Sequence, residues 1–503
     1  MNVIEIYRAL TKRVAGILVT DPLEDCSLAV PLYAHLDFLG DPVLRKATFA
    51  LLIVLTISAF VTLPYIAAGE TVLYGFCPSG TCSDGMWPSS TLVFDSAGNL
   101  YGTTSWGGEG WCSNRGCGVV FQLVPDTNGG WTENVLYTFC PEANCPDGAL
   151  PQGGVILDSA GNLYGATWGF EGSNVYELTR GANGQWTMKV LYSFKPEQGR
   201  YPTASLTFDA SGNLYGTMFG GGKNADSCAG SGGCGVVFEL SPGANGTWAE
   251  KDLHKFCSAP NCTDGAAPEG NLILDSEGDV YGTTRLGGGP NPDCGSYGCG
   301  IVYELTPNTD GKWTERVLHR FDSSGYSPYA GLTFDSDGNI FGTTFSGGGG
   351  TWKVCGGTGC GTVFELTPVG NGKWRQKIIM DWGELPGRPP LKPLSNLVFD
   401  SAGNLYGTSD AGGVDPHTGA VFRLRREANG TWKDEVLYSF LGLTRHDGQN
   451  PVAAVVPDAA GNVYGTTEYG GPYEMGWCGY NDAGCGTVFE INANDHDISD
   501  SLR

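Results

Sequence analysis

One eleven-residue phrase occurs seven times in this chain of 503 residues, and it constrains the fold more than any other feature. The copies begin at positions 94, 157, 208, 274, 334, 399 and 457 and read FDSAGNLYGTT, LDSAGNLYGAT, FDASGNLYGTM, LDSEGDVYGTT, FDSDGNIFGTT, FDSAGNLYGTS and PDAAGNVYGTT. Their spacing varies between 51 and 66 residues. The chain therefore contains seven units of about 60 residues, which share one repeated structure and differ in the length of their loops.

Each unit contains four short runs rich in β-branched or aromatic residues and bounded by turn residues. In the third unit these runs are SLTFD, NLYGTM, GVVFEL and a segment that ends DLHKF. The 79 Gly and 28 Pro exclude a helical bundle, while 41% hydrophobic residues suffice for a large core. Four strands repeated seven times predict an all-β fold, a seven-bladed β-propeller of four-stranded blades.

The aspartate of each phrase begins a tight hairpin turn, because its carboxylate can accept bonds from backbone N–H groups just downstream. A recurring Asn-Gly-x-Trp phrase predicts a second turn in most units. Calcium binding is the alternative for the aspartates, but we interpret them as structural turn residues. They are Asp95, Asp158, Asp209, Asp275, Asp335, Asp400 and Asp458.

The two ends of the repeat region indicate how the ring closes. The seventh unit lacks its fourth strand, because the chain continues from GTVFEI into a polar tail at residues 493–503. A spare strand, VLYGF, occurs at residues 72–76, before any complete unit. We therefore expect residues 69–492 to form the propeller, with this N-terminal strand completing the last blade and removing two sheet edges.

An uncharged apolar run at residues 47–69 follows Arg45 and Lys46 and ends in small residues. This pattern predicts that residues 45–68 are a signal peptide, with a retained membrane anchor helix as the alternative. Residues 1–44 are an unusual N-terminal extension for a signal peptide, and a mis-assigned start is one explanation. Both alternatives export everything that follows, so we expect a secreted, cell-surface or periplasmic protein.

Sixteen of the 17 cysteines follow the apolar run and form eight close pairs. An even number of cysteines in an exported chain predicts local disulfides. Metal binding is the alternative, but zinc sites usually contain Cys-x2-Cys knuckles, so we expect neither a metal nor a cofactor. The pairs are Cys77/Cys82, Cys112/Cys117, Cys140/Cys145, Cys228/Cys234, Cys257/Cys262, Cys294/Cys299, Cys355/Cys360 and Cys478/Cys485, and Cys26 is left over.

The unit DSAGNLYGTT…GG…GCGTVFEL…NGxW…VLYSF resembles the Gloeobacter and Verrucomicrobia (GloVer) repeat of exported bacterial proteins, also called choice-of-anchor tandem repeat proteins. The resemblance covers about residues 72 to 492. It implies an exported protein and supplies no catalytic residues. The strand-turn-strand phrase is also similar to NHL-type propeller repeats, whose members include binding modules and some lyases or lactonases.

The function must reside in variable loops, because the two turn types lie on one rim and the loops with the cysteine pairs lie on the other. Seven tryptophans in these loops suit sugar stacking or a protein contact, unless they pack over their own disulfides. They are Trp87, Trp106, Trp111, Trp168, Trp352, Trp382 and Trp477.

Other partners and activities are less consistent with the sequence. The net charge of -24 disfavours nucleic acid, and common hydrolase and nucleotide-binding motifs are missing. His254 and His319 take the place of a strand tyrosine, and a loop histidine, His417 or His446, is a candidate general base.

We therefore expect an exported, monomeric, non-catalytic module that binds a glycan or a protein and touches a membrane only through an uncleaved N-terminal segment. The alternatives are an extracellular lyase or hydrolase acting on a polysaccharide or lactone, and a structural envelope protein.

Overall fold

The structure, a computed structural model, separates Met1–Ala67 from Ala68–Arg503. Residues 69–492 are described except 113–114, 170–171, 223–227, 229–231, 350–354, 385–388, 474–477 and 479–483. The predicted extension at 1–44, the export segment at 45–68 and the tail at 493–503 lie outside the described residues. No helix in the described part of the chain has the length and apolar character needed to cross a membrane.

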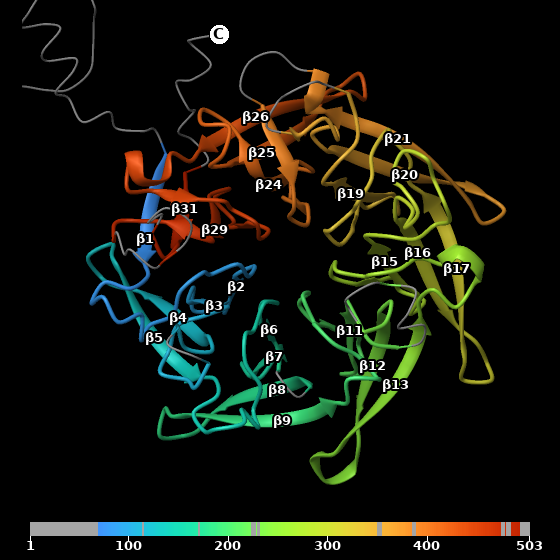
Figure 1. Ribbon diagram of the computed structural model, residues 1–503. Helices are drawn as coiled ribbons and strands as arrows, with labels where there is room; N and C mark the ends of the chain where they lie inside the picture. The colour runs from blue at the N-terminus through green and yellow to red at the C-terminus, as the bar shows by residue number, and fades with distance from the viewer. Residues whose placement is uncertain are drawn as a thin grey trace, which may run out of the picture. The chain divides into compact units, whose positions relative to one another are not determined.

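The described residues form seven antiparallel blades arranged around an axis, as predicted (Figure 1). The inner strands are β2 (Val93–Phe94), β6 (Ile156–Leu157), β10 (Thr207–Phe208), β14 (Ile273–Leu274), β18 (Thr333–Phe334), β23 (Val398–Phe399) and β28 (Val456–Pro457). The second strands are β3 (Leu100–Thr104), β7 (Leu163–Trp168), β11 (Leu214–Met218), β15 (Val280–Thr284), β19 (Ile340–Thr344), β24 (Leu405–Gly412) and β29 (Val463–Thr467).

The outer half of each blade contains longer strands. The third strands are β4 (Val119–Pro125), β8 (Ser173–Arg180), β12 (Val236–Pro242), β16 (Ile301–Pro307), β20 (Thr362–Gly370), β25 (Ala420–Arg426) and β31 (Thr487–Ile491). The outermost strands are β5 (Trp131–Thr138), β9 (Trp186–Phe194), β13 (Trp248–Lys255), β17 (Trp313–Arg320), β21 (Lys373–Asp381), β26 (Trp432–Ser439) and, in the seventh blade, β1 (Glu70–Gly75).

A few short elements depart from this pattern. In the sixth blade an additional strand, β22 (Pro390–Pro393), pairs with β24. A two-residue ribbon joins β27 (Gly448–Gln449) to β30 (Tyr469–Gly470). The described 3-10 turns are η4 (Ala244–Gly246), η5 (Pro260–Cys262), η7 (Trp382–Glu384) and η8 (Gly442–Thr444).

The repeated Tyr-Gly-Thr-Thr phrase forms the second strand, and its glycine is required by packing. A Cβ on Gly102 would lie 2.6 Å from the ring of Phe121 and 2.9 Å from Leu92. The equivalent glycine of each other blade faces the aromatic ring of its own third strand in the same way. The glycine of the phrase therefore makes room for a buried aromatic ring against the second strand of every blade.

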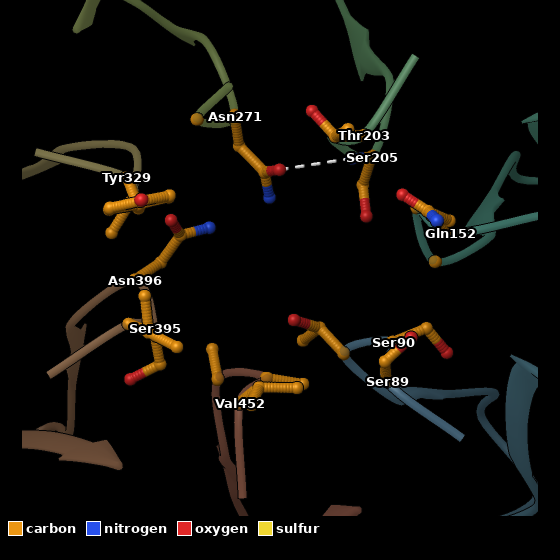
Figure 2. Close-up of a pocket in the computed structure, with 18 of the residues that line it drawn as sticks. Ser89, Ser90, Gln152, Thr203, Ser205, Asn271, Tyr329, Ser395, Asn396 and Val452 are labelled. Atoms are coloured by element: carbon orange, nitrogen blue, oxygen red, sulfur yellow. Dashed lines mark hydrogen bonds between the residues drawn. The ribbon is translucent and has the colours of Figure 1, made fainter. Parts of the chain in front are cut away.

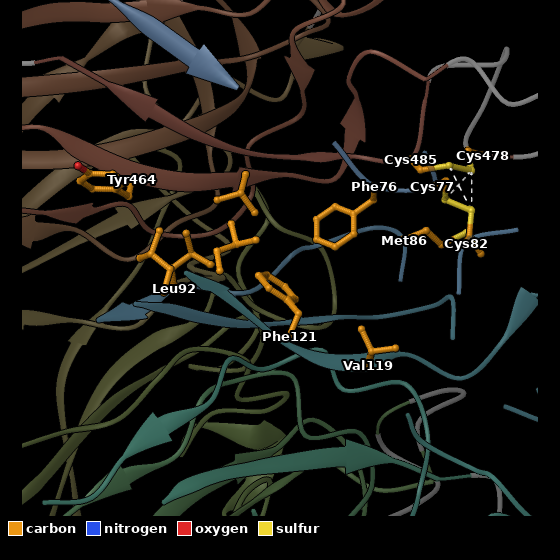
Figure 3. Close-up of a cluster of buried hydrophobic side chains, with 13 residues drawn as sticks. Phe76, Cys77, Cys82, Met86, Leu92, Val119, Phe121, Tyr464, Cys478 and Cys485 are labelled. Carbon is orange, nitrogen blue, oxygen red and sulfur yellow. Dashed lines mark hydrogen bonds between the residues drawn. A yellow bond between two sulfur atoms is a disulfide. The ribbon is translucent and has the colours of Figure 1, made fainter. Parts of the chain in front are cut away.

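The N-terminal strand closes the ring, as predicted. β1 pairs antiparallel with β31, from Glu70 opposite Ile491 to Gly75 opposite Thr487. Directly after β1, Phe76 is 1% exposed and packs edge-to-face on Phe121 of the first blade, with ring centroids 5.3 Å apart (Figure 3). One end of the repeat region therefore contributes to the core between the last blade and the first.

In three blades the outermost strand is joined to the loop after it by a tyrosine-aspartate hydrogen bond. Tyr74 donates to Asp84 over 2.8 Å, and Tyr438 donates to Asp447 over the same distance. His254 occupies the tyrosine position in the third blade, with its Nε2 3.3 Å from Asp264. The carboxyl group of Glu70, in β1, has an unusually high pKa. Burial, followed by the negative charge of Asp447, raises this pKa to about 8.

Candidate functional site

A narrow channel follows the propeller axis and is lined by the segments that lead into the seven inner strands (Figure 2). Each inner strand is preceded by a proline, and the residue directly after it reaches the channel. This position differs in every blade: it is Ser89, Gln152, Thr203, Glu269, Tyr329, Leu394 and Val452 in chain order. The channel cavity measures about 180 Å³, so it holds only water or a small group.

A ring of threonine hydroxyls holds the channel wall in place. Thr103 of β3 donates to the backbone carbonyl of Gly153 in the next blade over 3.1 Å, and Thr466 closes the ring onto Ser90 over 3.1 Å. The same inter-blade bond is made by Thr217, Thr283, Thr343 and Thr408. The second blade has Ala166 at this position. These buried bonds explain why Tyr-Gly is followed by threonine in the repeated phrase.

The residue before each of these prolines has an uncommon backbone conformation. All seven have φ between +53° and +63°, a region that non-glycine residues seldom occupy. They are Trp87, Leu150, Tyr201, Ala267, Ser327, Lys392 and Asn450. Left-handed residues in one repeated position concentrate strain at the end of the channel, and such strain is often found at functional sites.

Backbone hydrogen bonds fix these strained residues between two blades. The N–H of Leu150 donates to the carbonyl of Cys117 over 2.7 Å, and its own carbonyl accepts from Trp168 over 3.5 Å. In five blades the acceptor of the first bond is the second cysteine of a disulfide in the preceding blade: Cys485, Cys117, Cys234, Cys299 or Cys360. The disulfide loops therefore hold the channel end in position.

The second bond pairs each strained residue with the residue that follows the Tyr-Gly-x-x phrase. In chain order these partners are Ser105, Trp168, Phe219, Arg285, Phe345, Asp410 and Glu468. In the sixth blade the pair is set by strand register, since Leu391 lies opposite Ala411 and Pro393 opposite Ser409. We call these fourteen residues, two per blade, the mouth of the channel.

Blades one to three give the mouth an aromatic side. Trp87 packs edge-to-face on Trp106 with centroids 6.0 Å apart, and Trp168 packs on Tyr201 at 4.8 Å. A cavity of about 390 Å³ lies here, lined by Trp87, Ser89, Ser105, Trp106, Gln152, Thr203 and Glu468. Three of these residues also line the channel, so the cavity continues into it.

Blades four to seven give the mouth a charged side. Arg285 lies 3.2 Å from Glu269 and 4.5 Å above the ring of Tyr329. Lys392 lies over the ring of Phe345, 5.3 Å from its centroid.

Two carboxyl groups here, Glu269 in the channel wall and Glu468 in the mouth, hold protons more tightly than usual. Burial raises the pKa of Glu269, although Arg285 opposes this. Burial, opposed by a hydrogen bond from Tyr469 and reinforced by the charge of Asp410, also raises the pKa of Glu468. The mouth therefore offers aromatic faces together with carboxyl and cationic groups.

The structure separates the tryptophans that the sequence grouped together. Trp87 and Trp168 belong to the mouth, and Trp106 lies beside it. Trp111 is 68% exposed on an outer disulfide loop, where its indole N–H donates to the carbonyl of Pro141 over 3.1 Å. Trp382 is fully buried against Phe422. The remaining two candidates, Trp352 and Trp477, lie outside the described residues.

The predicted cysteine pairs are all bonded, which gives eight disulfides among the described residues. The turn aspartates accept bonds within their own turns, as Asp95 does from the N–H groups of Ala97 and Asn99. The loop histidines His417 and His446 are exposed.

Sequence reasoning missed several mouth residues, including Tyr201, Phe219, Arg285, Asp410 and Glu468. Their signal was available, because each lies either before the inner-strand proline or directly after the Tyr-Gly-x-x phrase. The residue type at these two positions changes from blade to blade, whereas the residues around them repeat. Such variation within a repeated sequence indicates positions that are not needed for the fold.

Fold and site together define a disulfide-rich, seven-bladed β-propeller with a variable mouth at one end of its axial channel. The Gloeobacter/Verrucomicrobia repeat matches residues 63–229, 172–373 and 291–500. The chain therefore belongs to the Gloeobacter/Verrucomicrobia repeat family. Its many disulfides and this family are compatible with an extracellular protein.

The chain is similar to several solved structures at low sequence identity. A protein from Lactobacillus plantarum is 13% identical, with a TM-score of 0.46 and coverage of 73% of this chain and 88% of that one. PorZ, a surface component of the type-IX secretion system of Porphyromonas gingivalis, is 13% identical, with a TM-score of 0.43 and coverage of 82% and 47%.

A third similar structure is an enzyme. The PQQ-bound aldose sugar dehydrogenase of Streptomyces coelicolor is 11% identical, with a TM-score of 0.37 and coverage of 71% and 98%. No curated protein matches the chain.

Proposed function

We propose that the protein is an exported, non-catalytic binding module, secreted or held at the cell surface or in the periplasm, whose mouth binds a carbohydrate. One observation carries this proposal: a backbone frame repeated seven times presents a different pair of side chains in every blade at the mouth. Variable side chains on a rigid, repeated frame are typical of binding surfaces.

The chemistry of the mouth favours a sugar over other ligands. Aromatic faces such as Trp87 and Trp168 suit the C–H faces of pyranose rings. The amide of Gln152, the hydroxyl of Thr203 and the carboxyl of Glu468 suit sugar hydroxyl groups. The aromatic-side cavity of about 390 Å³ falls in the range of small-molecule pockets, about 300–1,000 Å³. A protein ligand that inserts one side chain is the competing occupant.

A glycan array with the full chain, produced under oxidising conditions, tests the proposal. We expect selective binding by the wild type, at least a tenfold loss in Trp87→Ala and Trp106→Ala, and no change in Trp111→Ala, which lies on the outer loop. Absence of binding by folded protein, or a loss confined to Trp111→Ala, would overturn it.

A second variant guards against misfolding, because Trp87 and Trp106 also pack against a hydrophobic core. Gln152 lines both cavities and is not part of that core. We expect Gln152→Ala to weaken binding severalfold while its thermal unfolding stays that of the wild type.

The second candidate is a carbohydrate-cleaving enzyme, favoured by the carboxyl groups of Glu468 and Asp410 at the mouth. Many glycoside hydrolases use a pair of carboxyl groups, one as the acid and one as the nucleophile or base. Release of reducing ends or unsaturated sugars from a polysaccharide panel, abolished in Glu468→Gln, would favour this candidate. If neither binding nor cleavage is found, a structural role in the envelope becomes the better interpretation.

A further inference from the structure

We propose that three clusters of four cysteines, each made by two neighbouring disulfides, are latent sites for a thiophilic divalent cation such as Zn²⁺, filled once the disulfides are reduced. The clusters are Cys77, Cys82, Cys478 and Cys485; Cys112, Cys117, Cys140 and Cys145; and Cys228, Cys234, Cys257 and Cys262. This inference is independent of the function proposed for the mouth.

The distances between the two disulfides of a cluster already match those of a metal site, whereas the two sulfur atoms within each disulfide are bonded and separate only on reduction. In the first cluster the Sγ atoms of Cys77 and Cys478 are 3.9 Å apart, those of Cys82 and Cys478 are 3.9 Å apart, and those of Cys82 and Cys485 are 3.7 Å apart (Figure 3). Tetrahedral zinc with Zn–S bonds of about 2.3 Å separates its sulfur ligands by about 3.8 Å. In each cluster, all the sulfur atoms lie within 4.8 Å of one another.

Each cluster is assembled by one blade from two loops. One pair lies in the loop between the second and third strands, and the other lies in the loop after the outermost strand. In the first cluster these pairs are far apart in sequence, and the closure of the ring by β1 brings them together. A folded propeller therefore presents four cysteines as one group, as a closed structural zinc site requires.

The surroundings of the sulfur atoms suit thiolate ligands. The four cysteines of the first cluster are at most 1% exposed, so water is excluded from the site. In the second cluster the backbone N–H of Cys112 donates to the Sγ of Cys117 over 2.8 Å. Hydrogen bonds of this kind orient metal ligands and stabilise their negative charge.

Two other blades provide an internal contrast. The fourth and fifth blades each carry a single pair, Cys294/Cys299 and Cys355/Cys360, and no second pair follows their outermost strands. Two sulfur atoms cannot complete a four-thiolate site. The proposal therefore predicts three tight metal ions per chain, even though five blades contain disulfides.

The two states of a cluster exclude each other, because a disulfide sulfur is not a thiolate. A trialkylphosphine supplies the electrons: each equivalent breaks one S–S bond, takes oxygen from one water molecule to become a phosphine oxide, and leaves two thiols. Two equivalents therefore convert one cluster to four thiols. Metal binding then replaces the thiol protons, which pass to solvent.

Cobalt titration of the full chain tests the proposal. We would reduce the protein anaerobically with a phosphine, add Co²⁺ as the probe, and count the ions that produce the visible bands of tetrahedral cobalt thiolate. We expect three per chain, all displaced by Zn²⁺. The paired variant Cys478→Ser and Cys485→Ser should bind two, whereas Cys355→Ser and Cys360→Ser should still bind three.

Several results would overturn the proposal: no cobalt thiolate bands when the cluster thiols are free, five ions per chain, or the same loss in both paired variants. Circular dichroism would show whether the reduced chain stays folded. If it unfolds, the reduced chain is refolded with Zn²⁺ and its bound metal counted after gel filtration. Three zinc ions per refolded chain are expected, and none would refute the proposal.

Discussion

Replacing Phe76 by alanine tests whether the N-terminal strand belongs to the seventh blade. Phe76 is 1% exposed and contacts the rings of Tyr74 and Phe121, with centroids 5.1 and 5.3 Å away. Truncating a fully buried phenylalanine costs about 3–5 kcal/mol, because the lost burial adds to the cavity left behind. We therefore expect Phe76→Ala to lower the free energy of unfolding by about 4 kcal/mol.

Phe139 supplies a matched control within an unbroken blade. It is fully buried after β5 and contacts Tyr137 and Tyr176 at 5.3 and 5.1 Å, which reproduces the environment of Phe76. Urea unfolding under oxidising conditions, followed by tryptophan fluorescence and circular dichroism, should show similar losses for both variants. A loss below about 1 kcal/mol for Phe76→Ala beside a full loss for Phe139→Ala would refute closure by β1.

The other predictions concern single side chains. Glu70 has a folded pKa of about 8 against 4.5 in the unfolded chain, so the folded state binds more protons between these values. The stability that Glu70 contributes is therefore complete below pH 4.5 and is lost as the pH rises toward 8, by about 2–4 kcal/mol; thermal unfolding at several pH values should show this decline in the wild type and a flatter profile in Glu70→Gln. Asp95→Ala removes the acceptor for Ala97, Asn99 and Tyr101 and should cost about 2 kcal/mol in urea unfolding, while added calcium leaves the wild-type midpoint unchanged. Glu468→Gln should keep ligand affinity within about threefold in calorimetry if the mouth only binds, since the amide keeps the size of the side chain and can hydrogen-bond to sugar hydroxyl groups; a retained affinity with lost polysaccharide cleavage would instead identify an enzyme.

The fold could be predicted in detail because its rules are local and repeated. The Asp-x-x-Gly-Asn turn, the Tyr-Gly phrase and the cysteine spacing each occur several times, so one interpretation had to fit all copies. The spare strand before the first blade and the missing strand after the last were also visible in the sequence. Because the spare strand supplies the missing one, the closure of the propeller by the N-terminal strand could be predicted.

The candidate site was harder to predict, because side chains from distant units meet only around the axis. The sequence directed attention to tryptophan, yet Trp111 lies far out on its loop and Trp382 is fully buried. Nothing in the sequence assigns Arg285 and Glu468 to the same site, because they come from the fourth and seventh blades. The left-handed conformations before proline could not be predicted from the sequence either, since Leu150 and Tyr201 are not residues that usually adopt them.

A crystal structure of the protein soaked with oligosaccharides that bind in the glycan array would show directly whether a carbohydrate binds at the mouth of the axial channel. We expect sugar density in the cavity between Trp87, Trp106 and Glu468, with a ring stacked on an indole. Density confined to the outer disulfide loops, or to the opposite rim, would contradict it.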